Sequence, residues 1–157
     1  MTDVSGAVLA ARGLQWPERC APRGRFLPWR RAGTTVYLAG QICEWNGDVP
    51  YQGPIGDRVS ISDGIRAAEL CALNLLFHLR EACGGELDRV AGCLRVGAFV
   101  NALPGFRDSP RVADGASELF IALWGEAGRH ARTAVGVAAL PMNASVEIDA
   151  IFELKRD

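Results

Sequence analysis

Two residues near the C-terminal end of the chain, Arg132 and Glu147, have side chains that suit reactions of small carboxylic acids. A guanidinium can hold a carboxylate through two parallel hydrogen bonds. A glutamate can take a proton from water or return one to a reacting atom. The pair therefore predicts a site that binds a small acid and acts on it with water. A cross-strand ion pair explains the same two residues, so spacing alone leaves both interpretations open.

The signatures of other reaction classes are missing from the sequence. It contains no G-x-S-x-G, G-x-x-x-x-G-K or G-x-G-x-x-G motif, which argues against a nucleophile-elbow hydrolase and against these nucleotide-binding loops. His78 falls in an expected helix and His130 in an expected loop, and we interpret both as structural residues. The five cysteines form no C-x-x-C pair, so we expect reduced thiols and no metal site.

The segment that carries the pair reads as two strands joined by a turn. Residues 132–140 form the first strand, and residues 146–154 alternate between apolar and acidic side chains. Such alternation is typical of a strand with one face on the core and the other on water or a polar interface. We expect the two strands to form the last hairpin, with Arg132 and Glu147 on adjacent strands.

The rest of the chain predicts the frame around this hairpin. The pattern indicates a short helix in 4–14, two strands in 26–38, a loop at 45–57, a helix over 60–83, a strand over 93–101 and a helix over 112–124. This order predicts an α+β fold, a mixed sheet with two long helices on one face. The other sheet face then needs a cover, for which a second subunit is the obvious candidate.

Length and composition limit the class of protein. The chain has 157 residues, of which 49% are hydrophobic and 22% charged, with a net charge of −1. We expect a single domain over 25–157 after an N-terminal extension, residues 1–24. The balanced charge argues against nucleic acid as a partner, and no apolar run is long enough to span a membrane. The N-terminus does not look like a signal peptide, so we expect a cytoplasmic protein.

Several segments resemble the RidA (YjgF) family. The residues Ala131 to Val137 (ARTAVGV), Leu140-Pro141 and Val146 to Ile151 (VEIDAI) are similar to its C-terminal signature. Leu38 to Gln41 (LAGQ) and Phe99 to Asn101 (FVN) resemble two of its strands. The resemblance covers about residues 22–154. The N-terminal extension and the 45–57 loop suggest a divergent bacterial branch.

The resemblance implies a fold, an assembly and a reaction. The fold would be chorismate-mutase-like, and the assembly a homotrimer with pockets between subunits. The reaction would be hydrolysis of reactive enamines and imines of small 2-amino acids to 2-keto acids and ammonia, without a cofactor. Arg132 would bind the substrate carboxylate and Glu147 would orient the attacking water. The backbone of Ala134 would lie beside the imine carbon, and Phe99 would belong to the substrate-binding residues.

Three substrate-binding positions depart from the family pattern. Phe26 stands where active deaminases carry tyrosine, Ala39 replaces a serine, and Asp114 falls where they have asparagine. The first two changes remove hydroxyl groups that can bond to substrate or water. A second hypothesis is therefore a non-catalytic protein that binds a small carboxylated metabolite. A weaker alternative is the endoribonuclease activity assigned to some relatives.

Overall fold

The computed structural model describes residues 4–18 and 20–156, in which five strands form one mixed sheet with the order β1-β2-β5-β3-β4. Only β3 and β4 run parallel. The strands are β1 (Trp29–Ala32), β2 (Thr35–Ile42), β3 (Val90–Asn101), β4 (Ala131–Val137) and β5 (Val146–Leu154). The helices are α1 (Val4–Ala11), α2 (Ile61–Ala82) and α3 (Ser109–Trp124), with 3₁₀ turns at Leu87–Arg89, Gly125–Gly128 and Pro141–Asn143.

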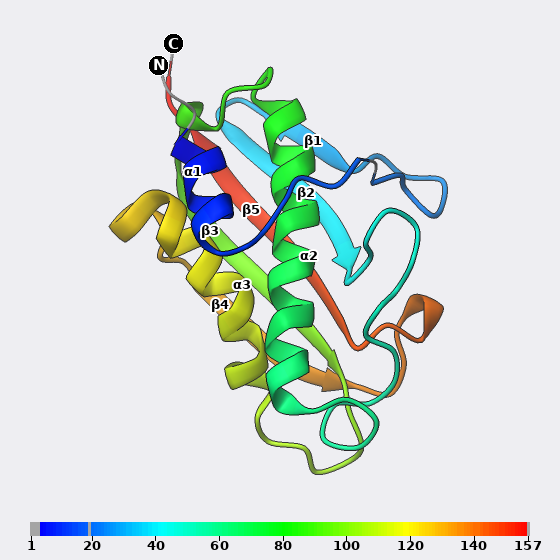
Figure 1. The fold of residues 1–157 in the computed structure, drawn as a ribbon. Helices are drawn as coiled ribbons and strands as arrows, with labels where there is room; N and C mark the ends of the chain where they lie inside the picture. Colours follow the sequence, from blue (N-terminus) through cyan, green and yellow to red (C-terminus); the bar gives the residue numbers. More distant parts are fainter. Residues whose placement is uncertain (1–3, 19, 157) are drawn as a thin grey trace.

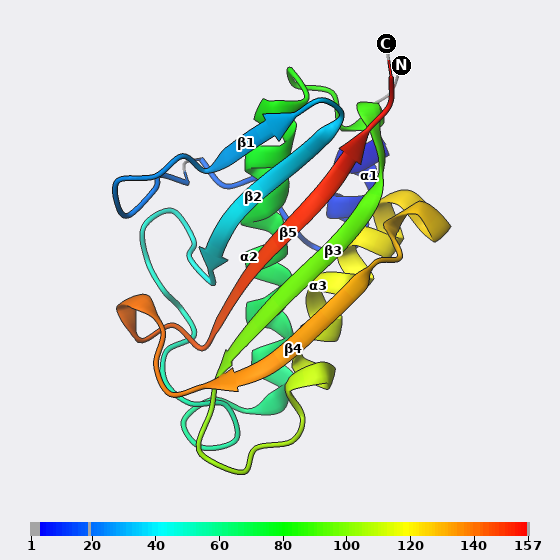
Figure 2. The same ribbon diagram turned by 180° about the vertical axis from the view of Figure 1, so that it is seen from behind.

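The two long helices pack against each other across one face of the sheet, as predicted (Figure 1). Figure 2 shows the opposite face, which no helix of the described residues covers. Helix α2 begins where predicted because the Ser60 hydroxyl accepts a hydrogen bond from the Asp63 backbone N–H at 3.0 Å. It ends before Gly84, whose φ of +70° is easily adopted by glycine. The α+β prediction is confirmed.

The core lies between the helices and one side of β5. Val146, Ile148, Ala150 and Phe152 are buried, while the acids between them point to the open face. The Phe152 ring meets Phe120 of α3 edge to face, with ring centroids 5.2 Å apart. The alternation predicted for this strand is therefore confirmed, and it fixes which face of the sheet each β5 side chain occupies.

The predicted hairpin between the last two strands is wrong. Strand β3 lies between β4 and β5, so Arg132 and Glu147 do not lie on adjacent strands and cannot form a cross-strand pair. The physical reason is the crossover through α3, which returns the chain parallel to β3 and pairs β4 with it. Strand β5 then pairs with the opposite edge of β3 and with β2.

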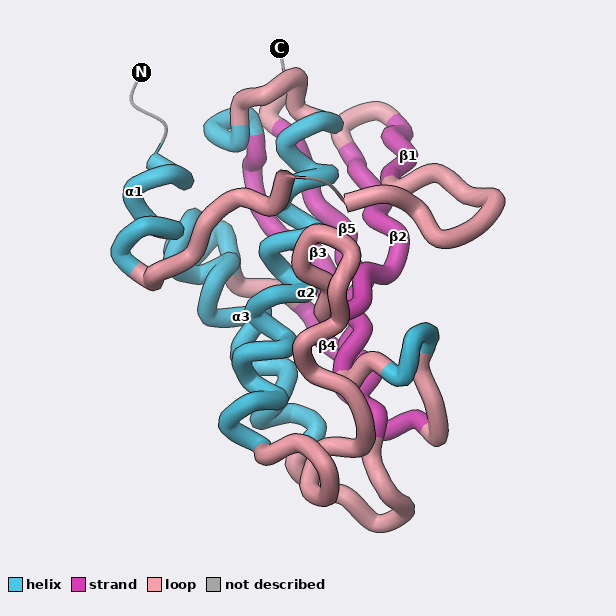
Figure 3. Tube along the Cα trace, turned by 45° about the vertical axis from the view of Figure 1, so that its right-hand side comes forward, coloured by secondary structure: helices cyan, strands magenta, loops and turns pink. Residues whose placement is uncertain are grey.

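The N-terminal segment packs on the helices. Leu9 of α1 is buried in the core, and the chain that follows α1 crosses the outside of α2 on its way to β1 (Figure 3). The Arg80 guanidinium of α2 lies 5.2 Å from the centre of the Trp16 ring. The boundary between a 1–24 extension and a 25–157 domain stays a prediction, and positions 1–3, 19 and 157 lie outside the described residues.

Other sequence expectations concern the thiols and the membrane. All five cysteines are free and buried. Within residues 4–18 and 20–156, no helix has the length and apolar character needed to cross a bilayer.

The two long helices, α2 and α3, lie close together at a glycine of α3, and a substitution there tests this packing. A Cβ atom at Gly115 of α3 would overlap the backbone carbonyl oxygen of Ile65 in α2. Gly→Ala in a helix interior normally stabilises by about 0.5–1 kcal/mol. Here we expect Gly115→Ala to lower the free energy of unfolding by about 1–3 kcal/mol, because backbone cannot move aside cheaply. Urea denaturation measures this, with Glu118→Ala on the exposed side of α3 as the control. An increase in stability for Gly115→Ala would contradict the packing.

Candidate functional site

The candidate site residues divide between the two faces of the sheet. Val96 of β3 pairs with both Arg132 and Ala150, which places Arg132 on the helix-covered face. Phe99 of β3 pairs with Glu147, and both point to the open face. A single chain therefore holds two separate groups of candidate functional side chains, which we call the Glu147 pocket and the Arg132 cluster.

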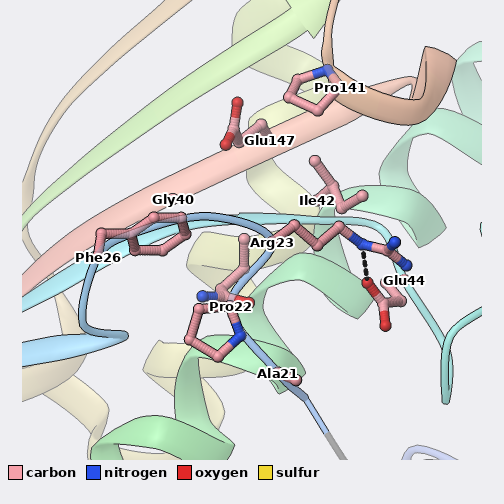
Figure 4. A pocket seen from close by; sticks show the side chains of 10 residues that line it. Ala21, Pro22, Arg23, Phe26, Gly40, Ile42, Glu44, Pro141 and Glu147 are labelled. Carbon is pink, nitrogen blue, oxygen red and sulfur yellow. Dashed lines mark hydrogen bonds and ion pairs between the residues drawn. The ribbon is translucent and has the colours of Figure 1, made fainter.

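The Glu147 pocket is a hollow of about 130 Å³ where β2 ends and β5 begins (Figure 4). Phe26 reaches it from the loop before β1, where nearly half of the residue is exposed. Phe99 lies beside Glu147 on the neighbouring strand. The lining residues are spread along the chain: Ala21, Pro22, Arg23, Phe26, Gly40, Gln41, Ile42, Glu44, Pro141 and Glu147.

Glycine at position 40 allows the Glu147 carboxylate to lie against β2. A Cβ atom there would be 2.7 Å from Glu147 Oε1, which is closer than such atoms normally approach. The pairing of β2 with β5 also shifts register between Leu38 and Gln41, as bulges near functional sites often do. Ala39 lies within this irregular stretch, but Gly40 and not Ala39 lines the pocket.

The environment of Glu147 favours its neutral form. Burial raises the pKa of this carboxyl, and the nearby Asp149 carboxylate on the same face raises it further. In the described part of the chain no cation pairs with Glu147 that would oppose these effects. The carboxyl can therefore exchange a proton with a bound water more readily than an ordinary surface glutamate, which stays ionised near neutral pH.

Arg23 and Glu44 add an ion pair to the wall of this pocket. Arg23 Nε lies 2.8 Å from Glu44 Oε2, and Arg23 Nη2 donates to the Gly47 carbonyl at 3.2 Å. Sequence reasoning missed both residues because they lie in loops without periodicity, and Arg23 falls in the segment interpreted as an extension. Three of the lining residues, Ala21 to Arg23, come from that segment.

The Arg132 cluster consists of Asp114, Ser117, His130 and Arg132. Arg132 Nη1 donates to Asp114 Oδ1 at 2.8 Å and to Ser117 Oγ at 3.0 Å. Its Nη2 donates to the Pro110 carbonyl at 3.0 Å. These three acceptors all belong to α3, so the guanidinium joins edge strand β4 to that helix. The cluster borders an open hollow of about 230 Å³ that Ile121 and Arg129 also line.

His130 fixes the direction of the hydrogen bonds in this cluster. Its Nδ1 lies 2.7 Å from the Gly128 carbonyl, which can only accept, so Nδ1 carries the proton. The bare Nε2 then accepts from the Ser117 hydroxyl at 2.9 Å. Burial lowers the pKa of His130, and the charge of Arg132 lowers it further, so the ring is neutral near pH 7.

The structure brings some of the sequence-predicted residues together and separates others. Phe26 and Glu147 line the Glu147 pocket, and Phe99 pairs with Glu147 on the neighbouring strand without lining it. Asp114 contacts Arg132 on the other face. Ala134 lies two residues beyond Arg132, half-buried on that same face. Sequence reasoning missed Ser117 and the link through His130. The spacing of three residues between Asp114 and Ser117 on one helix was the available signal.

The described residues contain no group of three or more histidine, cysteine, aspartate or glutamate side chains placed to hold a metal ion.

Comparisons with known proteins agree with this fold. A family model described as "YjgF/chorismate_mutase-like, putative endoribonuclease" matches residues 6–154. Protein TCP17 from Trypanosoma cruzi is 37% identical over 149 residues, which cover 94% of this chain and 92% of the relative. A protein named 2-iminobutanoate/2-iminopropanoate deaminase from Dermatophagoides farinae is 31% identical over 145 residues, covering 92% and 97% of the two chains.

A solved structure extends the agreement to three dimensions. A crystal structure of a protein of unknown function from Agrobacterium tumefaciens superposes with a TM-score of 0.92 at 38% identity, covering 98% of this chain and 94% of the other. Both the family model and these relatives span nearly the whole described chain, N-terminal segment included. The chain therefore belongs to the YjgF/RidA family of chorismate-mutase-like proteins.

Proposed function

We propose that this protein hydrolyses reactive enamine and imine intermediates of small 2-amino acids to 2-keto acids and ammonia, without a cofactor. The observation that carries the proposal is Glu147, a half-buried carboxyl with a raised pKa in a small pocket. The name of the mite relative points to the same reaction. The assignment to a divergent bacterial branch stays a prediction, since the three similar proteins named above come from a trypanosome, a mite and a bacterium. The cytoplasmic location also stays a prediction.

The site that we propose is shared between two copies of the chain in a homotrimer. Arg132 and Glu147 lie on opposite faces of one sheet, so one chain cannot bring both to the same small substrate. The open sheet face offers Tyr37, Val135 and Ile151 as apolar contacts for a neighbouring copy. A neighbour docked there can place its Arg132 cluster opposite the Glu147 pocket.

The chemistry follows from the roles of the two residues. Arg132 holds the substrate carboxylate, and the backbone at Ala134 lies beside the imine carbon. Glu147 removes a proton from water as the water oxygen bonds to that carbon. The protonated Glu147 then returns the proton to nitrogen. The C–N bond breaks as Glu147 takes the hydroxyl proton and the carbonyl forms, and the departing ammonia receives that proton from Glu147. Water and the iminium ion are consumed, and the 2-keto acid and ammonium are produced.

A second candidate is non-catalytic binding of a small carboxylated metabolite. It is favoured by Phe26, whose ring enters the pocket without the hydroxyl that would hold a water. Calorimetry with a panel of keto acids and amino acids identifies this case as binding without turnover. Ribonuclease activity has less support, because the chain has a net charge of −1 and the pocket contains two carboxylates.

The proposed reaction predicts the effect of two substitutions. A pyridoxal-phosphate dehydratase supplies 2-aminoacrylate, and pyruvate release is followed with time. We expect the protein to accelerate release, and Glu147→Gln and Arg132→Ala each to lower the acceleration by about 100-fold or more. Glu153→Gln, on the same strand face but outside the pocket, is the control. No acceleration by the unaltered protein would reject the enzymatic proposal.

Sharing of the site predicts complementation between inactive variants. Arg132→Ala and Glu147→Gln are refolded together, so that some interfaces combine an intact Arg132 from one copy with an intact Glu147 from another. Random mixing restores about a quarter of the sites. We expect activity near that fraction in the mixture, with trimers seen by analytical ultracentrifugation. Activity no higher than the sum of the separate variants would place both residues outside a shared site.

The pKa of Glu147 can be measured directly by NMR titration of its side-chain carboxyl carbon. We expect a value above that of an ordinary glutamate, and a partial decrease in Asp149→Asn, because the repulsion is lost while burial remains. A raised pKa also means that this residue's contribution to stability is complete at low pH and is lost as pH rises through the folded-state pKa. An unshifted titration in the unaltered protein would contradict the burial argument.

A further inference from the structure

The Arg132 cluster holds its guanidinium in one orientation and leaves some of its N–H groups without an acceptor in the cluster. Three of the five N–H groups bond to Asp114, Ser117 and the Pro110 carbonyl. The Ser117 oxygen faces Arg132 because its own hydroxyl hydrogen points to His130 Nε2. The Nε–H and one Nη2 hydrogen therefore remain for a ligand, within the part of the chain that the structure describes.

Asp114 also has an oxygen that can accept a further hydrogen bond. Its Oδ1 accepts from Arg132, and about half of its side chain is exposed beside the open hollow. A carboxylate accepts hydrogen bonds through both oxygens, so Oδ2 can accept from a cationic donor in that hollow. The hollow thus presents a fixed cation and a fixed anion in direct contact.

The remaining charges around the hollow cancel. Arg129 lines it as well, but its Nε lies 3.0 Å from Glu126 Oε1. His130 is neutral near pH 7 because burial and Arg132 lower its pKa. Arg132 and Asp114 offset each other. A simple anion that enters therefore meets no net positive charge, and the Asp114 carboxylate repels it.

We propose that Asp114 makes this half-site selective for zwitterions, namely compounds in which a carboxylate stands next to a cationic nitrogen. The ligand carboxylate accepts the free N–H groups of Arg132, and the cationic nitrogen donates to the second oxygen of Asp114. The preferred class is 2-amino acids and 2-iminium acids over 2-keto acids, which carry the carboxylate alone. The Asp114 carboxylate then gives specificity in two ways, because it attracts the cationic nitrogen of a zwitterion and repels a ligand that carries only a negative charge.

This inference deepens the proposed function and rests on it for its biological meaning. The iminium substrate of a deaminase is a zwitterion, whereas the 2-keto acid product is an anion. An acid at position 114 thus holds the substrate and speeds release of the product. Position 114 is also one of the positions at which this chain departs from the family pattern, since it carries aspartate where active deaminases have asparagine.

Two ligands that differ only in the group on C2 test the proposal. Calorimetry of the full chain at pH 7.5 compares 2-aminobutanoate with 2-oxobutanoate. We expect the amino acid to bind about 10-fold more tightly, the effect of one charge-assisted hydrogen bond. In Asp114→Asn, which keeps the shape and an acceptor oxygen for Arg132, we expect the preference to disappear or reverse. The keto acid should gain affinity in that variant.

Glu118→Gln provides the matched control, because it removes one acid from the same helix outside the hollow. Its ligand preference should equal that of the unaltered protein, and thermal melts confirm that both variants fold. The proposal is overturned if the unaltered protein binds the keto acid as tightly as the amino acid, or binds neither. It is also overturned if Asp114→Asn leaves the ratio unchanged.

The outcome separates this proposal from the deaminase proposal. Zwitterion preference that depends on Asp114, without any turnover of 2-aminoacrylate, supports the selectivity and rejects the enzyme. Turnover with equal binding of both ligands supports the enzyme and rejects the selectivity.

Discussion

The arrangement of this molecule depends on one constraint, the burial of a single face of its sheet against α2 and α3. Every second side chain of β5 must be apolar to satisfy that core, which leaves Glu147 and Asp149 on the open face. A register slip of one residue would move these carboxylates under the helices, where an unpaired charge costs several kcal/mol. The position of the candidate catalytic carboxyl is thus a consequence of packing in the core.

The same constraint explains why the candidate site residues are divided between the two faces of the sheet. Helix α3 must cover the sheet between β3 and β4, so β4 returns parallel to β3 at the sheet edge. Arg132 then points under α3, where acceptors on that helix hold it. A guanidinium on the helix side and a carboxyl on the open side cannot serve one substrate within one chain. The shared site that we propose between two copies would bring the two groups together without changing the fold.

Local signals in the sequence predict most of the elements but not their neighbours. Ser60 and Gly84 mark the ends of α2, and the alternation in β5 predicts its faces, because each depends on contacts close in sequence or on one buried side. The short connection before β5 suggested a hairpin, and only the long-range pairing of β3 with both β4 and β5 decides otherwise. Arg23 and Glu44 meet through loops that have no periodic pattern.

Asp114 differs from the asparagine of the family pattern by a single negative charge, and the effect of that charge on ligands is larger than its effect on stability. Its side chain is about half exposed, so its ion pair with Arg132 contributes only about 0–1 kcal/mol to stability. Ser117 and the Pro110 carbonyl also join β4 to α3, so the fold does not require an acid at position 114. A contact of small structural value that changes the charge met by every ligand is better explained by recognition than by folding. Phe26 lines the Glu147 pocket with an aromatic ring that lacks a hydroxyl, so this departure also changes the chemistry of a pocket wall while the pocket stays open.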